Sequence, residues 1–176
     1  MTRLKEDEEM DAAVSAAREK LAHVTPLKKD CGRICGGRCC QSMDGEETGM
    51  LLFPGEAERY AGRPGWKILN TERGDLAVCP GVCDRDDRPL SCRLFPLLPF
   101  IGNDEKIRVV VDLRARAVCP LARQGKTAMD PVFIDAVREA GEILAKAEEP
   151  AMILDLLEQE QEELRELGRK LYIREL

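Results

Sequence analysis

Eight cysteines in three groups are the feature of this 176-residue sequence that most constrains its fold. The groups read C-x3-C-x3-C-C, C-x3-C-x8-C and a final C-P. Their members are Cys31, Cys35, Cys39, Cys40, Cys79, Cys83, Cys92 and Cys119. A chain of this length can bury a core without disulfide staples, and cysteines at such short spacings are typical of metal ligands. The sequence therefore predicts a metal-binding protein in which all eight cysteines are ligands.

The charge pattern and the N-terminus favour a cytoplasmic protein. The opening MTRLKEDEEMD has no apolar stretch of the kind that secretory signals contain, so we expect the thiols to stay reduced. No apolar run approaches the roughly 20 residues that cross a bilayer. The sequence therefore predicts no membrane-spanning helix. The net charge is -6. Residues 28–123 contain 16 Lys and Arg and 14 Asp and Glu, whereas the flanking residues contain 11 Lys and Arg and 19 Asp and Glu. Such acidic flanks argue against a nucleic-acid partner and leave a protein partner open.

The composition predicts a fold that a metal helps to organise. Only 4% of the residues are aromatic, so few large side chains can supply burial, and the free energy of metal binding can add to that of folding. Glycine and proline concentrate in residues 28–123. We expect an α+β, mostly helical single domain over residues 1–176, with a loop-rich cysteine core at 28–123 that has short strands. An N-terminal helix at 3–22 and a C-terminal helical hairpin at 130–172 should flank this core.

Helical periodicity locates the flanking elements. Met10, Val14, Ala17 and Leu21 share one face of the first predicted helix. Asp130 and Pro131 form a helix start, and the predicted helix ends at Pro150. Its buried face comprises Phe133, Val137, Ala140, Leu144 and Ala147. A second helix from about 151 to 172 should pack back on the domain through Ile153, Leu157, Leu164, Leu167 and Leu171.

Within the core, two segments have the composition of strands. Residues 107–113 form an apolar, β-branched run, and residues 50–53 form a shorter one that leads into a helical turn at 54–60. Glu56 and Glu58 in this turn could act as general bases, but helix formation alone explains them.

Zinc and an iron–sulfur cluster both suit four thiolates. Structural zinc sites usually have C-x2-C pairs about 15 to 20 residues apart, whereas three residues separate the paired cysteines here. Iron–sulfur ligands are often followed by proline, as are Cys79 and Cys119. The predicted cofactor is therefore an iron–sulfur cluster or zinc, with the cluster favoured. Eight sulfurs suffice for two four-ligand centres, and one or two centres remain open.

Arginines surround the second cysteine group. Arg88 and Arg93 are the predicted cofactor-binding residues, because their guanidinium groups can donate hydrogen bonds to thiolate or sulfide sulfur and neutralise it. The alternative is that they belong to a rigid loop that positions Cys92. His23, the only histidine, lies far in sequence from the cysteines, and we expect it to be a surface or capping residue.

Four motifs follow one another between residues 31 and 121. They are C-x3-C-G-x2-C-C, L-L-F-P-G-E-A-E, C-x3-C-x8-C with R-P-x2-C-R-x-F-P, and C-P. In this order they resemble the YkgJ-type cysteine-cluster family, which is described as zinc- or iron-chelating. That family more often has two residues between its first two cysteines, where this chain has three. The resemblance implies a metal-chelating role. A related cluster occurs in flagellin lysine methylases, which implies a methyltransferase as an alternative.

Two functions therefore remain at the level of sequence. The first is a metal-binding protein whose centre holds the fold and serves a partner in metal handling or sensing. The second is an iron–sulfur enzyme or electron carrier that acts on protein side chains in the manner of a lysine methylase. The chain has no Walker loop, dinucleotide fingerprint or G-x-S-x-G elbow, and its catalytic residues are unknown. The first function is favoured.

Overall fold

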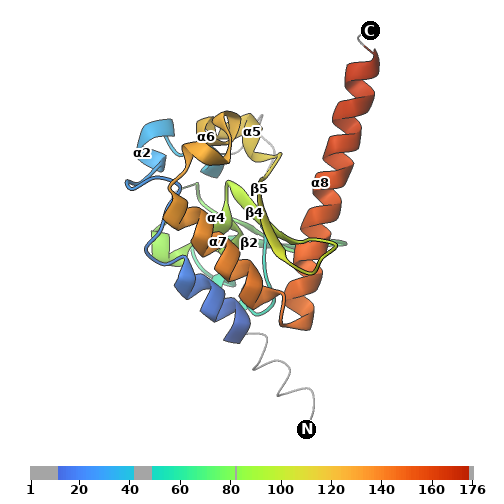
Figure 1. Ribbon diagram of the computed structural model, residues 1–176. Coiled ribbons are helices and arrows are strands. Elements are labelled where there is room, and N and C mark those ends of the chain that lie inside the picture. The colour runs from blue at the N-terminus through green and yellow to red at the C-terminus, as the bar shows by residue number, and fades with distance from the viewer. Residues whose placement is uncertain (1–11, 42–48, 82, 175–176) are drawn as a thin grey trace.

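Two small antiparallel sheets and the helices packed around them form an α+β fold, as predicted (Figure 1). The structure is a computed structural model that describes residues 12–41, 49–81 and 83–174. The first sheet has the order β1-β3-β2, and the second pairs β4 with β5. Their bounds are β1 Met50–Leu51, β2 Lys67–Thr71, β3 Gly74–Val78, β4 Leu97–Ile101 and β5 Ile107–Val111. In register, Leu51 and Leu69 both face Leu76, and Pro99 faces Val109.

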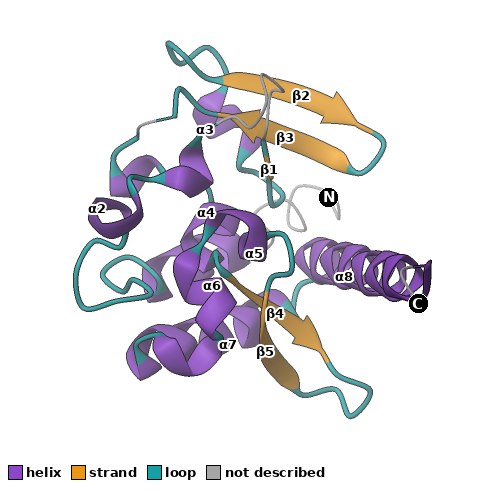
Figure 2. Ribbon diagram, turned by 90° about the horizontal axis from the view of Figure 1, so that it is seen from above, coloured by secondary structure: helices purple, strands orange, loops and turns teal. Residues whose placement is uncertain are grey.

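Short helical segments connect the strands. They are α2 Gly32–Cys35, η1 Arg38–Cys40, α3 Ala57–Tyr60, η2 Arg85–Asp87, α4 Leu90–Leu94, α5 Ala115–Val118, α6 Pro120–Gln124 and η3 Lys126–Ala128. Seen from above, α4, α5 and α6 lie between the two sheets, with α2 beside them (Figure 2). This arrangement places the cysteine-bearing segments near one another at one end of the molecule, away from the lower end of the first helix (Figure 1).

The first helix covers residues 12–20 in the described part of the chain. Its predicted residues 3–11, including Met10, lie outside the described residues. Val14, Ala17 and Leu21 are fully buried, so the predicted apolar face is confirmed for the described part of the helix. The helix stops two residues earlier than predicted, and residues 21–23 form a turn.

The predicted start of the next long helix, α7 (Pro131–Leu144), is confirmed. The Asp130 carboxylate accepts a hydrogen bond from the backbone N–H of Val132 at 3.0 Å, and Pro131 takes the first helical position. Phe133, Val137, Ala140 and Leu144 are all fully buried. The predicted end at Pro150 is wrong, because α7 ends at Leu144 and Pro150 lies in the first turn of α8. A first-turn proline interrupts no helical hydrogen bond.

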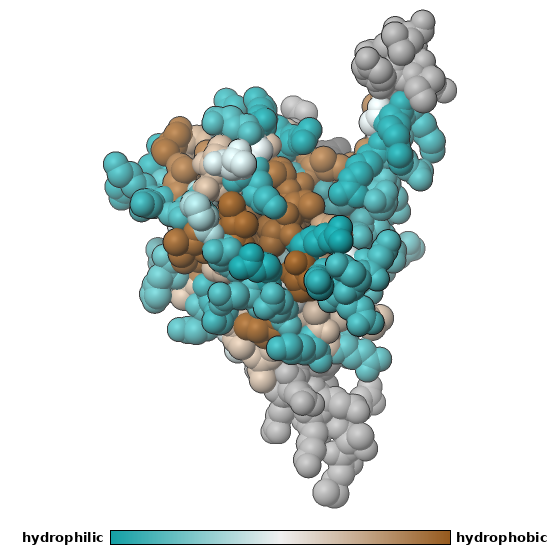
Figure 3. Space-filling view, in the orientation of Figure 1, coloured by the Kyte–Doolittle hydropathy of each residue, from teal (hydrophilic) through white to brown (hydrophobic). Residues whose placement is uncertain are grey.

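Helix α8 (Glu148–Arg174) packs on the domain only through its first half. Leu154, Leu157 and Gln161 are buried, and this half contacts β4 more than it contacts α7. Leu167 and Leu171 are exposed, and the second half of the helix extends beyond the body (Figure 1). The prediction that the whole helix packs back in a hairpin is therefore wrong for residues beyond 164. Figure 3 shows that the surface of this projecting half is mainly hydrophilic.

The main core joins the first helix, α4, the second sheet, α7 and the first half of α8. Gly141 in α7 is where the helix approaches the sheet most closely: a Cβ there would lie 2.6 Å from Pro99 Cβ and 2.9 Å from Ile107 Cγ2. A separate small cluster of Leu52, Tyr60 and Ala77 lies under Trp66, which stacks on Tyr60. No helix of the described residues is long and apolar enough to cross a membrane.

Both predicted strands are shorter than expected, and three further strands were not predicted. The strand expected at 107–113 ends at Val111, because Asp112 turns the chain and is buried among hydrogen bonds. The strand expected at 50–53 is reduced to β1, and the expected turn at 54–60 contains α3. Strands β2, β3 and β4 were missed.

Candidate metal centre

The eight cysteines come from four parts of the chain and lie on the elements at one end of the fold. Cys31 and Cys35 bound α2, and η1 carries Cys39 and Cys40. The remaining four lie after β3, in α4 and between α5 and α6; these are Cys79, Cys83, Cys92 and Cys119. All eight are free thiols, seven are half-buried and Cys39 is exposed. The fold therefore brings together, on neighbouring elements, cysteines up to 88 positions apart in the sequence.

The first cysteine group is shaped by two consecutive glycines. Gly36 and Gly37 have φ angles of 68° and 66°, in the left-handed region that favours glycine. Gly36 ends α2, with its N–H bonded to the carbonyl of Gly32, and Gly37 starts η1. The backbone curls between Cys35 and Cys39 as the sequence predicts.

The second cysteine group lies against the first. A Cβ at Gly81, between Cys79 and Cys83, would lie 3.2 Å from the carbonyl oxygen of Cys40. The chain at Gly81, just after Cys79, therefore lies against the last residue of η1. Gly81 has a φ of 83°, so both its conformation and its contact favour glycine.

The thiols surround two adjoining cavities. The first has a volume of about 210 Å³ and is lined by Cys31, Cys35, Cys39, Cys92 and Cys119. The second has a volume of about 580 Å³ and is lined by Cys39, Cys40, Cys79, Cys83 and Cys92. Four residues line both, so the two spaces adjoin at these side chains: Cys39, Arg88, Cys92 and Phe95.

The thiols fit a metal group in their chemistry. Thiolates bind zinc and iron–sulfur clusters, and four of them complete either kind of site. In the described parts of the chain, no three Cys, His, Asp or Glu side chains converge closely enough to hold one ion. The sulfurs instead border spaces several times the roughly 30 Å³ share of one water molecule. Such spaces suit a polynuclear cluster better than a lone ion, because the cysteines of a cluster are divided among several irons.

Burial and mutual proximity set the protonation of the thiols. Burial raises the pKa of Cys31, Cys83 and Cys92. The Sγ atoms of Cys39 and Cys40 lie 3.8 Å apart and share a hydrogen bond, which raises the pKa of Cys39 and lowers that of Cys40 to about 6. Crowded thiols of this kind are ionised most readily by a bound cation, which is the usual coupling of metal binding to proton release.

Arg88 is the cation placed among the thiols. Although burial lowers its pKa, the nearby Cys83 and Cys40 sulfurs raise it overall, and its side chain is within hydrogen-bonding reach of Cys83. Its Nε is buried and has no hydrogen-bond partner among the described residues. A buried, unpaired N–H beside thiols is a donor that a sulfur ligand or sulfide could accept.

Arg93 and Arg85 donate hydrogen bonds to backbone carbonyl groups. The Arg93 guanidinium donates to the carbonyls of Arg88, Arg18 and Asp86 at 2.9–3.3 Å. Arg85 donates to the carbonyls of Ala22, Leu21 and Val24, at and beyond the end of the first helix. Both side chains line the first cavity, yet their visible bonds fasten the loop before Cys92 to the first helix. These contacts favour the positioning role for Arg93 over direct cofactor binding.

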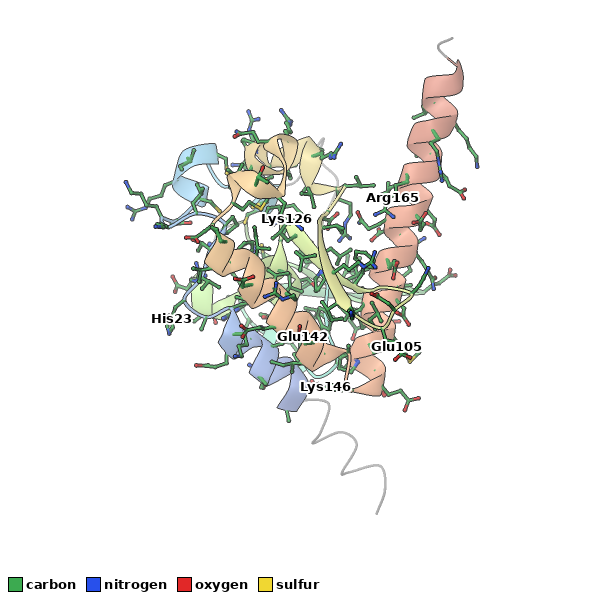
Figure 4. The ribbon with its side chains drawn as sticks, viewed as in Figure 1. His23, Glu105, Lys126, Glu142, Lys146 and Arg165 are labelled. Atoms are coloured by element: carbon green, nitrogen blue, oxygen red, sulfur yellow. The ribbon has the colours of Figure 1, made fainter. Side chains whose placement is uncertain are left out.

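The acidic and histidine candidates lie elsewhere. Glu56 is fully buried and accepts from Arg18, Phe53 N and Leu90 N, so it joins three segments and is not a free base. Glu58 is exposed. His23 is exposed as predicted and lies at the edge of the molecule, apart from α2, α5 and α6 (Figure 4). Sequence reasoning missed Arg18. Nothing in the local spacing of residues indicates that Arg18 is buried against Glu56.

Comparison with known proteins gives no match: no family model, no curated protein and no solved structure matches this chain. The resemblance to the YkgJ-type family over residues 31–121 thus stays a prediction from the cysteine motifs.

Proposed function

We propose that this chain is a metal-binding cysteine-cluster protein whose thiols hold iron–sulfur or zinc centres. The observation that carries the proposal is the arrangement of all eight free thiols around two adjoining cavities, with Arg88 between them. A metal centre there would stabilise the short helical segments and serve a protein partner in metal handling or sensing. The resemblance of the motifs to a zinc- or iron-chelating family supports the same function.

Cavity size favours an iron–sulfur occupant over zinc. A zinc–sulfur bond of about 2.3 Å draws four sulfurs tightly around one ion. The thiols of the described residues border wider spaces, of about 210 and 580 Å³. A cluster supplies bridging sulfide that fills such space, and the unpaired Arg88 Nε is a suitable donor toward it.

Anaerobic purification with elemental analysis tests the proposal. Protein made in cells and kept reduced should carry stoichiometric iron with acid-labile sulfide, and a visible absorption that is lost on chelation. Stoichiometric zinc without visible absorption would keep the metal-binding function and overturn the iron–sulfur assignment. Folded protein that is free of metal, with all eight thiols titrating, would overturn the function itself.

A further inference from the structure

The doublet of Cys39 and Cys40 lies where the two cavities meet. Cys40 lines only the second cavity, and its carbonyl is in contact range of Gly81 in the turn that carries Cys79 and Cys83. Cys39 lines both cavities, and it is the only member of the doublet that reaches the first. Adjacent residues can therefore serve different centres, because only Cys39 of the two also reaches the first cavity.

Three cysteines are exclusive to each cavity. The first cavity alone is lined by Cys31, Cys35 and Cys119, and the second alone is lined by Cys40, Cys79 and Cys83. Cys39 and Cys92 line both, so one of them completes each set of four. Either Cys39 completes the first set and Cys92 the second, or the reverse.

The neighbours of the shared cysteines decide the division. Helix η1, which carries Cys39, packs against α5, and α5 ends directly before Cys119 of the first cavity. Cys92 is then the shared thiol that remains to complete the second set, with Cys40, Cys79 and Cys83. Cys39 therefore belongs with the first set and Cys92 with the second.

We propose that the chain holds two separate metal centres, divided at the peptide bond between Cys39 and Cys40. The first centre is ligated by Cys31, Cys35, Cys39 and Cys119. The second is ligated by Cys40, Cys79, Cys83 and Cys92. The proposal rests on the metal-binding function proposed above, and it adds the number of centres and the membership of each.

Arg88 has a defined place in this arrangement. It lines both cavities, so its positive charge is shared by two sets of thiolates that would otherwise repel each other at close range. Its unpaired Nε gives it one donor to direct at a ligand of either set. Two negatively charged centres can thus lie next to each other in the fold.

The adjacent pair supplies a matched comparison. Cys39→Ser and Cys40→Ser change neighbouring residues in the same way, so ordinary disturbance of η1 should affect both alike. In the two-centre arrangement each loses about half of the wild-type metal, and the loss is from different centres. Cys39→Ser combined with Cys119→Ser should then lose no more than either alone, whereas Cys39→Ser combined with Cys83→Ser should lose nearly all.

Metal content and its spectrum after anaerobic purification measure these losses. Loss of all metal from every single variant, or additive loss from the Cys39 and Cys119 pair, would overturn the division. One ion or cluster bridging Cys39 and Cys40, whose sulfurs are 3.8 Å apart, is the competing arrangement, and it requires both variants to lose the same centre. Metal-free wild-type protein is a separate outcome that overturns the proposed function itself.

A measurement on wild-type protein covers variants that fail to fold. During slow release of metal by a chelator, exposed thiols are alkylated and mapped by mass spectrometry. The four cysteines of one set should become reactive together, and those of the other set together in a second step. Reactivity that appears at all eight in one step, or in groups that mix the sets, would overturn the two-centre proposal even if metal is bound.

Discussion

The Arg18 guanidinium and the Glu56 carboxylate form a buried ion pair, with Nη1 and Oε1 separated by 2.6 Å. Glu56 is fully inaccessible, and its two oxygens also accept from the backbone N–H groups of Phe53 and Leu90. One carboxylate thus joins the first helix, the turn before α3 and the start of α4. Because α4 carries Cys92, this pair fixes one predicted ligand against the core.

Replacing Glu56 by Ala should lower the free energy of unfolding by about 3 to 5 kcal/mol, because Arg18 would be left buried without its partner. Glu58→Ala, at an exposed position two residues away, is the matched control and should change it by no more than about 0.5 kcal/mol. Denaturant unfolding under reducing conditions measures both. Equal midpoints for the two variants would show that the pair contributes nothing beyond a surface glutamate.

Gly141→Ala should be destabilising even though alanine is the better helix former by about 1 kcal/mol. The added methyl would collide with Pro99 and Ile107 at the contact of α7 with the second sheet. Gly168→Ala in α8, where a Cβ meets nothing within 4 Å, should be stabilising by about 0.5 to 1 kcal/mol. Opposite shifts of the thermal midpoint are expected, and shifts of the same sign would contradict the close packing of α7.

Gln161 joins α8 to the end of β5. Its side chain accepts from Leu113 N at 2.8 Å and donates to the buried Asp112 at 3.1 Å. Gln161→Ala should therefore cost about 1 to 3 kcal/mol, because the buried Asp112 carboxylate and the half-buried Leu113 N–H would each lose a hydrogen bond. Gln159→Ala, on the same helix but exposed, should be nearly neutral. Chemical denaturation of the two variants gives the comparison, and a neutral Gln161→Ala would mean that α8 is held by its leucines alone.

Local chemistry in the sequence explains which parts of the fold could be predicted. Asp130 caps its helix through a bond to a residue two positions on, and buried apolar residues recur at helical spacing after it. The hairpin of β2 and β3 was missed because its turn, Glu72-Arg73, lacks the Asn-Gly or Asp-Gly pair that marks a tight turn. Pro150 led to the prediction of a helix end. Proline is common both in the first turn of a helix and just after the last turn, and the sequence alone does not distinguish these two positions.

In the candidate site, too, some features can be predicted from the local sequence and others depend on the fold. Spacing alone predicts that the cysteines are ligands, which stays a prediction, and that the glycines at 36 and 37 curl the chain, which the structure confirms. Spacing cannot pair Cys92 with Cys40 or set Cys119 beside α2, because those neighbours depend on how α4, α5 and η1 pack in three dimensions. That Cys39 lines both cavities and Cys40 only the second is likewise a property of the fold.

Removing metal should loosen the cysteine end far more than the helical end. Among the described residues, α2, η1 and η2 contain no buried residue, whereas α7 contains six. Hydrogen exchange with and without chelator should show faster exchange for 31–40, 79–92 and 115–124, and unchanged protection for Pro131–Leu144. Uniform loss of protection, or no change anywhere, would contradict a metal that organises only this end.

Arg88→Lys should weaken metal binding by about 10- to 100-fold, the usual effect of losing a group that hydrogen-bonds the ligands. Lysine keeps the positive charge between the two cavities but loses the planar fork and the Nε that is now unpaired beside the thiols. Arg38→Lys is the control, since Arg38 is exposed and adjoins Cys39 in the chain. Competition against a chelator of known affinity measures both variants. If Arg88→Lys binds metal as tightly as Arg38→Lys, then charge alone accounts for Arg88, and its guanidinium donates no bond that matters to the centres.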